Sequence, residues 1–298
     1  MSTLATTAPR SASDTLRLVL GVFKLRIGVV IAVTALAGWA ITPGRSLAAW
    51  QVVVLGLAVL FSSAAAGAFN QYVERDLDVR MARTRKRAFV TGALPHTRGW
   101  LALILLLVLG STLAAWWALN GWAALYTFLG AFFYAVVYTV WLKRRTWLNI
   151  VIGGLAGSFA VLAGAAAVDP TIGAIPMLLA VVLFLWTPPH FWSLAIAYRK
   201  DYEEAGVPML PVVAGEARAA RVIFAHTLAL VGVSLVPAFL GLSPLYLACA
   251  LLGGGYFIRT SWQLMRAPGP KRAMINFHAS LAQLTLILLA ALIEGALH

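Results

Sequence analysis

Long apolar runs, separated by short polar segments, dominate the hydropathy pattern of this chain. Each run is close to the length of about 20 residues that an α-helix needs to cross a bilayer. Nine spans are predicted, at residues 25–42, 50–69, 99–119, 121–141, 148–168, 171–194, 219–241, 243–258 and 277–296. The runs do not alternate between apolar and polar positions, which argues against an outer-membrane barrel. The pattern therefore predicts an all-α polytopic membrane protein.

The same pattern predicts one domain. Residues 1–20 are rich in serine and threonine and are expected to form a flexible cytoplasmic N-terminus, and residues 21–298 a single transmembrane domain. No cleavable secretory signal is evident in the opening segment. Since it also carries no long presequence, we expect a bacterial inner membrane as the location.

Composition agrees with a membrane protein, and the distribution of charge gives its orientation. The chain is 61% hydrophobic and 11% charged, with a mean hydropathy of +0.87. Its net charge of +13 arises from polar segments on one side, at residues 75–98, 143–145, 199–221 and 259–272, whereas the opposite side holds only Arg45. This asymmetry follows the positive-inside rule with a cytoplasmic N-terminus. It accounts for the basic balance without a nucleic-acid partner.

Asn70, Glu74 and Asp78 follow directly on the apolar run of residues 50–69. If the helix continues, their i, i+4, i+8 spacing places them on one face, about 6 Å apart along the axis. Oxygen ligands of this kind suit Mg²⁺. Asp76 points off this face, and we expect it to pair with Arg75 or Arg80.

Basic residues and a second acidic cluster occur on the same side of the predicted bundle. Arginine and lysine side chains suit diphosphate oxygens, although ordinary topology-setting charge is the alternative for each base. The candidate diphosphate ligands are Arg83, Arg87, Lys143 and Arg144. Asp201 and Glu204 would supply further metal ligands, the alternative being a solvated loop. The sequence thus favours a metal–diphosphate site at the cytoplasmic face.

His190 follows Pro188 and Pro189 within the sixth predicted span, where a kink or break is expected. An ionisable group at membrane depth usually has a function, although a structural hydrogen bond is the alternative here. Beyond the break, His190 and Asp201 would share one helix face, about 16 Å apart along the axis. One end of that face could meet a diphosphate and the other a large planar substrate.

These motifs resemble the UbiA superfamily of intramembrane prenyltransferases, and within it the protohaem IX farnesyltransferase family. The first motif of the superfamily is matched by Asn70, Glu74 and Asp78, with glutamate where aspartate is usual. The haem-directed signatures are matched by residues 138–154 and 186–192, continuing to residues 201–211. Ala205 stands where many quinone-directed relatives carry an aspartate, which fits a haem-directed member. The resemblance covers roughly residues 20–295.

The resemblance implies a UbiA-type bundle and an Mg²⁺-dependent enzyme. Such an enzyme transfers a farnesyl group from farnesyl diphosphate to a vinyl group of haem B, with water addition, to give haem O for terminal oxidase assembly. It implies that Asn70, Glu74, Asp78, Asp201 and Lys143 act in catalysis. It also implies that haem contacts His190, Trp186 and Tyr138. A complex with a haem A synthase or with oxidase assembly factors is left open.

Two alternatives remain at this point. One is a UbiA-type prenyltransferase acting on a quinone or chlorophyll precursor. The other is a membrane transporter, which would carry charge near the middle of its spans. The predicted spans are nearly free of such charge, and their acids cluster on one side, so the pattern favours the enzyme.

Overall fold

The computed structural model describes residues 11–297, and this part of the chain contains helices and loops but no strand. The first half comprises α1 (Ala12–Val22), α2 (Leu25–Ala40), α3 (Ala49–Val73), α4 (Arg75–Arg80), α5 (Ala88–Thr91), α6 (Gly99–Ala118), α7 (Gly121–Phe132) and the π-helix η1 (Phe133–Leu142). The second half comprises α8 (Asn149–Gly153), α9 (Leu155–Val168), α10 (Ala174–Ala197), α11 (Arg199–Glu204), α12 (Leu210–Ala214), α13 (Glu216–Phe239), α14 (Pro244–Arg266) and α15 (Pro270–Leu297).

Helices occupy all nine predicted spans, but nine membrane crossings are not confirmed as a number. Seven described helices, with η1 joined to α7 and α8 to α9, are long and apolar enough to cross a bilayer; the pair α1 and α2, bent by 48°, raises the count to eight. The 23-residue α14 is long enough but too polar, because Arg259 and Gln263 lie in its second half. Helix α1 also begins within the segment predicted to be flexible. The domain boundary after residue 20 therefore stays a prediction.

Large apolar side chains point outward around the bundle. Leu106, Leu252, Trp117 and Phe239 are each more than two-thirds exposed. Water would penalise so much exposed apolar surface, whereas lipid tails accept it. The chain is therefore a multi-pass membrane protein.

Small residues allow the helices to approach closely. A Cβ on Gly164 of α9 would overlap the carbonyl oxygen of Ala35 of α2, and one on Gly38 would overlap that of Val161. Backbones in contact through glycine are typical of membrane helix pairs. Helices α2 and α9 are therefore packed backbone against backbone at these two glycines.

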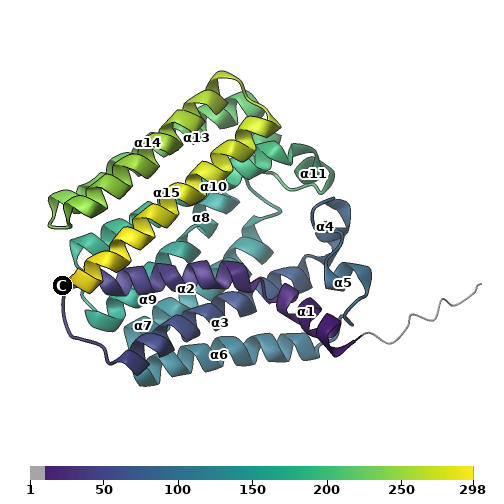
Figure 1. The fold of residues 1–298 in the computed structure, drawn as a ribbon. Helices are drawn as coiled ribbons and strands as arrows, with labels where there is room; N and C mark the ends of the chain where they lie inside the picture. The colour runs from purple at the N-terminus through teal and green to yellow at the C-terminus, as the bar shows by residue number, and fades with distance from the viewer. Residues whose placement is uncertain (1–10, 298) are drawn as a thin grey trace, which may run out of the picture.

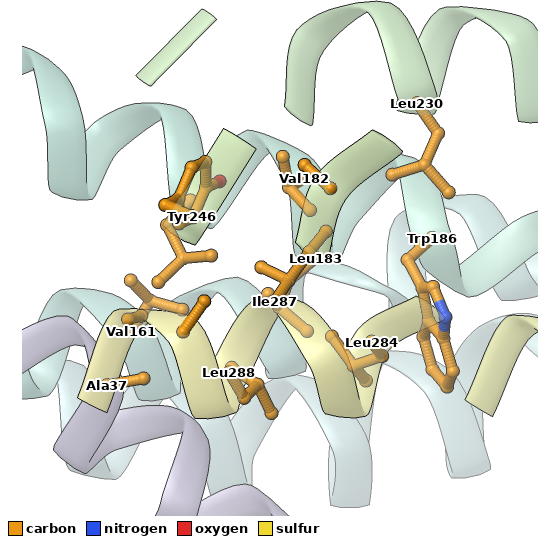
Figure 2. Close-up of a cluster of buried hydrophobic side chains, with 14 of the residues drawn as sticks. Ala37, Val161, Val182, Leu183, Trp186, Leu230, Tyr246, Leu284, Ile287 and Leu288 are labelled. Atoms are coloured by element: carbon orange, nitrogen blue, oxygen red, sulfur yellow. The ribbon is translucent and has the colours of Figure 1, made fainter. Parts of the chain in front are cut away.

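A buried apolar cluster joins the C-terminal helices to α2 and α9. Trp186 and Leu183 of α10 pack with Leu284 and Ile287 of α15, and Leu230 of α13 lies on the other side of α10 (Figure 2). In Figure 1, α15 runs diagonally across this half of the bundle. The cluster holds α10, which carries two of the three predicted haem-contacting residues, against α15.

Helix α10 continues through Pro188 and Pro189, so the predicted break at these prolines is wrong. The prolines remove the backbone bonds to the carbonyls of Phe184 and Leu185, four residues earlier. Packing of α10 in the buried apolar cluster keeps the segment helical despite this loss. The helix ends instead at Ala197. Asp201 lies on the separate helix α11, and the predicted continuous face from His190 to Asp201 does not form.

The two ends of the bundle differ in charge. The short helices α4, α5 and α11 gather at one end, close to α1 (Figure 1). Arg45 lies at the other end, where its guanidinium donates to Ala167 O at 3.0 Å and to Leu119 O at 3.2 Å. It thereby donates to carbonyl oxygens at the C-terminal ends of α9 and α6, where carbonyls lack a partner within the helix. The chemistry-bearing residues belong to the opposite, basic end.

Candidate active site

A cavity of about 770 Å³ extends from the basic end into the bundle. Its size falls in the range of small-molecule sites. The wall is largely apolar at depth, with Val59, Leu183 and Leu284 among its residues. Seven bases and two acids also line it, namely Arg17, Lys24, Arg26, Arg83, Lys86, Arg87, Lys143, Glu74 and Asp78. This excess of positive charge attracts an anion.

The first acidic motif lies in the cavity wall, as its spacing predicts. Helix α3 ends at Val73 and α4 begins at Arg75, so the helix is interrupted at Glu74. The i→i+4 bonding nevertheless continues: Glu74 N donates to Asn70 O at 3.0 Å and Asp78 N donates to Glu74 O at 2.8 Å. All three side chains are buried. They remain neighbours despite the change of helix.

Each buried carboxylate of the motif is paired with a base. Lys143 Nζ lies 2.5 Å from Glu74 Oε2, and Arg87 Nη1 lies 2.6–2.7 Å from both oxygens of Asp78. Glu74 Oε1 is buried without a hydrogen-bond partner among the described residues. An oxygen acceptor is thus left available at the centre of the motif.

Lys24 is a site residue that the sequence analysis missed. It lies between α1 and α2 with a left-handed φ of 48°. Its Nζ donates to Asn70 Oδ1 at 2.7 Å and to the Tyr134 hydroxyl at 3.3 Å. The sequence feature that could have identified it is a lysine placed between the apolar residues Phe23 and Leu25.

The π-helix η1 positions Tyr138 and Lys143 at the cavity. Lys143 N donates to Tyr138 O at 2.9 Å, the i→i+5 bond of a π-turn. The rings of Tyr134 and Tyr138 stack with centroids 5.7 Å apart. A Cβ on Gly153 would lie 2.9 Å from the Tyr138 ring, so this glycine provides room for it. π-Helical segments are rare in proteins and occur frequently at functional sites.

Several predicted site residues lie outside the cavity wall. Asp201 is half-buried and its Oδ2 accepts from Arg83 N at 3.4 Å, which places it at the rim. Glu204 is exposed, so the structure does not bring it to the other acids. Its position on the outer turn of the short helix α11 explains this separation.

Arg144 also lies outside the wall, because it binds Asp76. Both of its terminal nitrogens lie 2.7 Å from Asp76 oxygens. These hydrogen bonds lower the pKa of Asp76 below its usual 3.8. The expected pairing of Asp76 with Arg75 or Arg80 is therefore wrong. A partner 68 residues away meets the carboxylate instead.

His190 and Trp186 line the deeper part of the cavity. Their rings stack with centroids 4.1 Å apart. His190 Nδ1 lies 2.7 Å from Ser280 Oγ, and Trp186 Nε1 donates to Ser280 O at 2.8 Å. Helix α15 thus fixes two of the three side chains that the resemblance assigns to haem.

Within residues 11–297, the structure shows no group of three or more acids, histidines or cysteines arranged to hold a metal. Lys143 and Arg87 occupy the carboxylate oxygens that a cation would need. Glu74, Asp78 and the amide of Asn70 nevertheless have the oxygen chemistry that Mg²⁺ prefers, and Glu74 Oε1 has no partner among the described residues.

Comparison with known proteins identifies the family. The sequence pattern of the UbiA prenyltransferase family matches residues 31–287. The chain belongs to the UbiA prenyltransferase family. It is 57% identical, over 95% of its length and 98% of the relative's, to protoheme IX farnesyltransferase 2 of Paramagnetospirillum magneticum strain AMB-1. It is 39% identical, over 99% of its length and 98% of the relative's, to protoheme IX farnesyltransferase 1 of Pseudomonas putida strain GB-1.

Solved UbiA-type structures share the fold. A digeranylgeranylglyceryl phosphate synthase aligns with a TM-score of 0.79 at 15% identity, covering 96% of this chain and all of that one. A UbiA homolog from Archaeoglobus fulgidus, bound to DMAPP and Mg²⁺, aligns with a TM-score of 0.70 at 17% identity. The alignment covers 91% of this chain and 98% of that one. The predicted UbiA-type bundle is confirmed.

Proposed function

We propose that this protein transfers a farnesyl group from farnesyl diphosphate to a vinyl group of haem B, with addition of water, and so produces haem O. The main observation behind this proposal is that the chain is 57% identical in sequence, along nearly its whole length, to a protoheme IX farnesyltransferase. The cavity supports it, since a basic, acid-bearing mouth leads to an apolar interior. That is the shape and charge of a site for a lipid-like diphosphate.

The bases at the mouth would bind the diphosphate. Lys24, Lys143, Arg83 and Arg87 all line this part of the wall. As the bond from the allylic carbon to the diphosphate oxygen breaks, negative charge grows on the leaving group. Preorganised cations that meet this charge are usually the largest contribution to catalysis. Lys143 and Arg87 are preorganised by Glu74 and Asp78, their carboxylate partners.

Glu74, Asp78 and Asn70 would hold Mg²⁺ against the same diphosphate, with Asp201 as the further acid at the rim. The buried, unpartnered Glu74 Oε1 supports this assignment. When bound, Mg²⁺ neutralises charge on the leaving group. Glu204 is left out of the set because it is exposed and away from the cavity.

The apolar depth of the cavity would receive the farnesyl chain and keep water away from the allylic cation. A haem vinyl group forms the new carbon–carbon bond with that cation. Water then adds to the resulting cation beside the porphyrin and loses a proton, leaving a hydroxyethylfarnesyl substituent. Trp186, His190 and Tyr138 line the cavity and would contact the porphyrin.

The cellular setting is part of the proposal. We place the protein in a bacterial inner membrane, with its N-terminus and basic end in the cytoplasm, by the positive-inside rule. Haem O would pass to terminal oxidase assembly, for which a haem A synthase or an assembly factor is the expected partner.

Incubation of the purified protein with haem B, farnesyl diphosphate and Mg²⁺, followed by mass analysis of the haem, tests the activity. The expected product is heavier than haem B by one farnesyl group and one hydroxyl group, because the added water loses a proton. A parallel reaction with an aromatic quinone precursor tests the alternative acceptor. Prenylation of that precursor, with haem left unchanged, would overturn the proposal.

A further inference from the structure

His190 is held so that only one edge of its ring is free. Trp186 stacks on one face with a centroid distance of 4.1 Å, and Phe277 packs nearly parallel to the ring at 4.3 Å. Phe191 approaches edge-on at 5.0 Å. Both faces are therefore covered by aromatic carbon, and the imidazole cannot rotate without displacing these rings.

The hydroxyl group of Ser280 selects the tautomer of this imidazole. Its one proton is donated to Phe277 O, at an Oγ–O distance of 2.6 Å. Since the same oxygen lies 2.7 Å from His190 Nδ1, it can only accept there, so Nδ1 carries the hydrogen. Nε2 then bears a lone pair. A hydrogen bond to one ring nitrogen commonly fixes the other as a metal ligand.

The Nε2 edge belongs to the cavity wall. Among the described residues Nε2 has no hydrogen-bond partner, and it is not among the fully buried polar atoms. It is therefore accessible from the cavity that His190 lines. His190 lies seven residues before the end of α10, which is about 10 Å along the axis at 1.5 Å per residue. His190 therefore lines the cavity about two helical turns away from the end of α10 nearest the basic mouth.

From these contacts we infer that His190 Nε2 is an axial ligand of the haem iron, and that Ser280 is the positioning residue which presents it. This deepens the proposed function, because it takes the porphyrin to be the acceptor substrate. The coordination bond forms by donation of the Nε2 lone pair to iron, with no change of oxidation state. It would fix the height and orientation of the porphyrin, so that a vinyl group meets the farnesyl chain.

Two other histidines make the assignment selective. His278 is exposed, and His226 packs on Trp192; neither lines the cavity. Replacing either by alanine should leave the haem spectrum unchanged. Ser234 provides a matched control for Ser280, since its buried hydroxyl also donates to a carbonyl three residues earlier, Val231 O, at 2.8 Å.

The test is a titration of the purified, full-length protein with ferric haem B, followed by absorption and electron paramagnetic resonance spectroscopy. Wild-type protein should show a histidine-ligated spectrum. His190→Ala should lose it and regain it on addition of free imidazole. Ser280→Ala should weaken haem binding about 10- to 100-fold, which is the usual effect of removing the hydrogen bond that orients a metal-binding histidine. Ser280→Thr and Ser234→Ala should bind haem like the wild type.

An unchanged spectrum and affinity in His190→Ala would overturn the inference, as would loss of the ligand signal in His278→Ala or His226→Ala instead. The farnesyl-transfer reaction, run on the same samples, separates this failure from that of the proposed function. Haem O formation by wild type without a histidine–iron signal rejects only the ligand. Absence of both haem binding and haem O formation in the wild type rejects both.

Discussion

The buried pair of Lys143 and Glu74 gives the strongest prediction about the site. Their side chains are only 11% and 1% exposed, and Lys143 Nζ lies 2.5 Å from Glu74 Oε2. Lys143→Met would leave the carboxylate buried with neither oxygen satisfied, because Glu74 Oε1 already lacks a partner. Removing one member of a buried ion pair costs about 3–5 kcal/mol. We expect a loss of stability in that range.

The double variant Lys143→Met/Glu74→Gln separates stability from activity. It removes both charges, and replacing a whole buried pair is often nearly neutral, so most of the lost stability should return. Farnesyl transfer should not return, since both side chains are assigned to the diphosphate site. Arg144→Met is the matched control. Its pair with Asp76 has side chains 41% and 54% exposed, and such pairs contribute about 0–1 kcal/mol.

Unfolding in mixed micelles of increasing SDS content would give these free energies, and mass analysis of haem would give the activities of the same preparations. The reasoning is refuted if Lys143→Met is as stable as Arg144→Met. It is refuted equally if the double variant transfers farnesyl at the wild-type rate.

Three further predictions address other parts of the molecule. Lys24→Met should lower kcat/KM for farnesyl diphosphate about tenfold or more, because a hydrogen bond from a charged group contributes about that factor. Haem affinity measured by titration should stay unchanged. A kcat/KM equal to that of the wild type would remove Lys24 from the site. Gly164→Val should cost about 1–3 kcal/mol in the same unfolding assay, whereas Gly232→Val, whose Cβ meets nothing within 4 Å, should not; equal stabilities would contradict the close helix contact. The lowered pKa of Asp76 means that its pair with Arg144 stabilises the protein above pH 3.8, and that this contribution fades as pH falls through the lowered value; Asp76→Asn should flatten the acid side of the stability profile by at most about 1 kcal/mol, and an unchanged profile would contradict it.

Local pattern was enough to predict the helices and the first motif. Hydropathy located each apolar helix, and the i, i+4 spacing placed Asn70, Glu74 and Asp78 together even though the helix is interrupted at Glu74. Both features depend on periodicity within one segment, which a sequence records directly.

Contacts between distant segments could not be predicted in the same way. Lys24 reaches Asn70 across 46 residues, and Arg144 reaches Asp76 across 68. Nothing in either local sequence specifies those partners. The helix through Pro189 likewise depends on its surroundings, because packing of α10 in the buried cluster outweighs the usual effect of proline.

Binding of Mn²⁺ in place of Mg²⁺, followed by electron paramagnetic resonance with farnesyl diphosphate present, tests most directly whether the buried carboxylates hold a divalent cation. Wild-type protein should bind Mn²⁺, and so should Glu204→Gln, whose side chain is exposed outside the cavity. Asp78→Asn should lose that binding while still inserting in the membrane. Mn²⁺ binding by Asp78→Asn that is as tight as in the wild type would contradict the account.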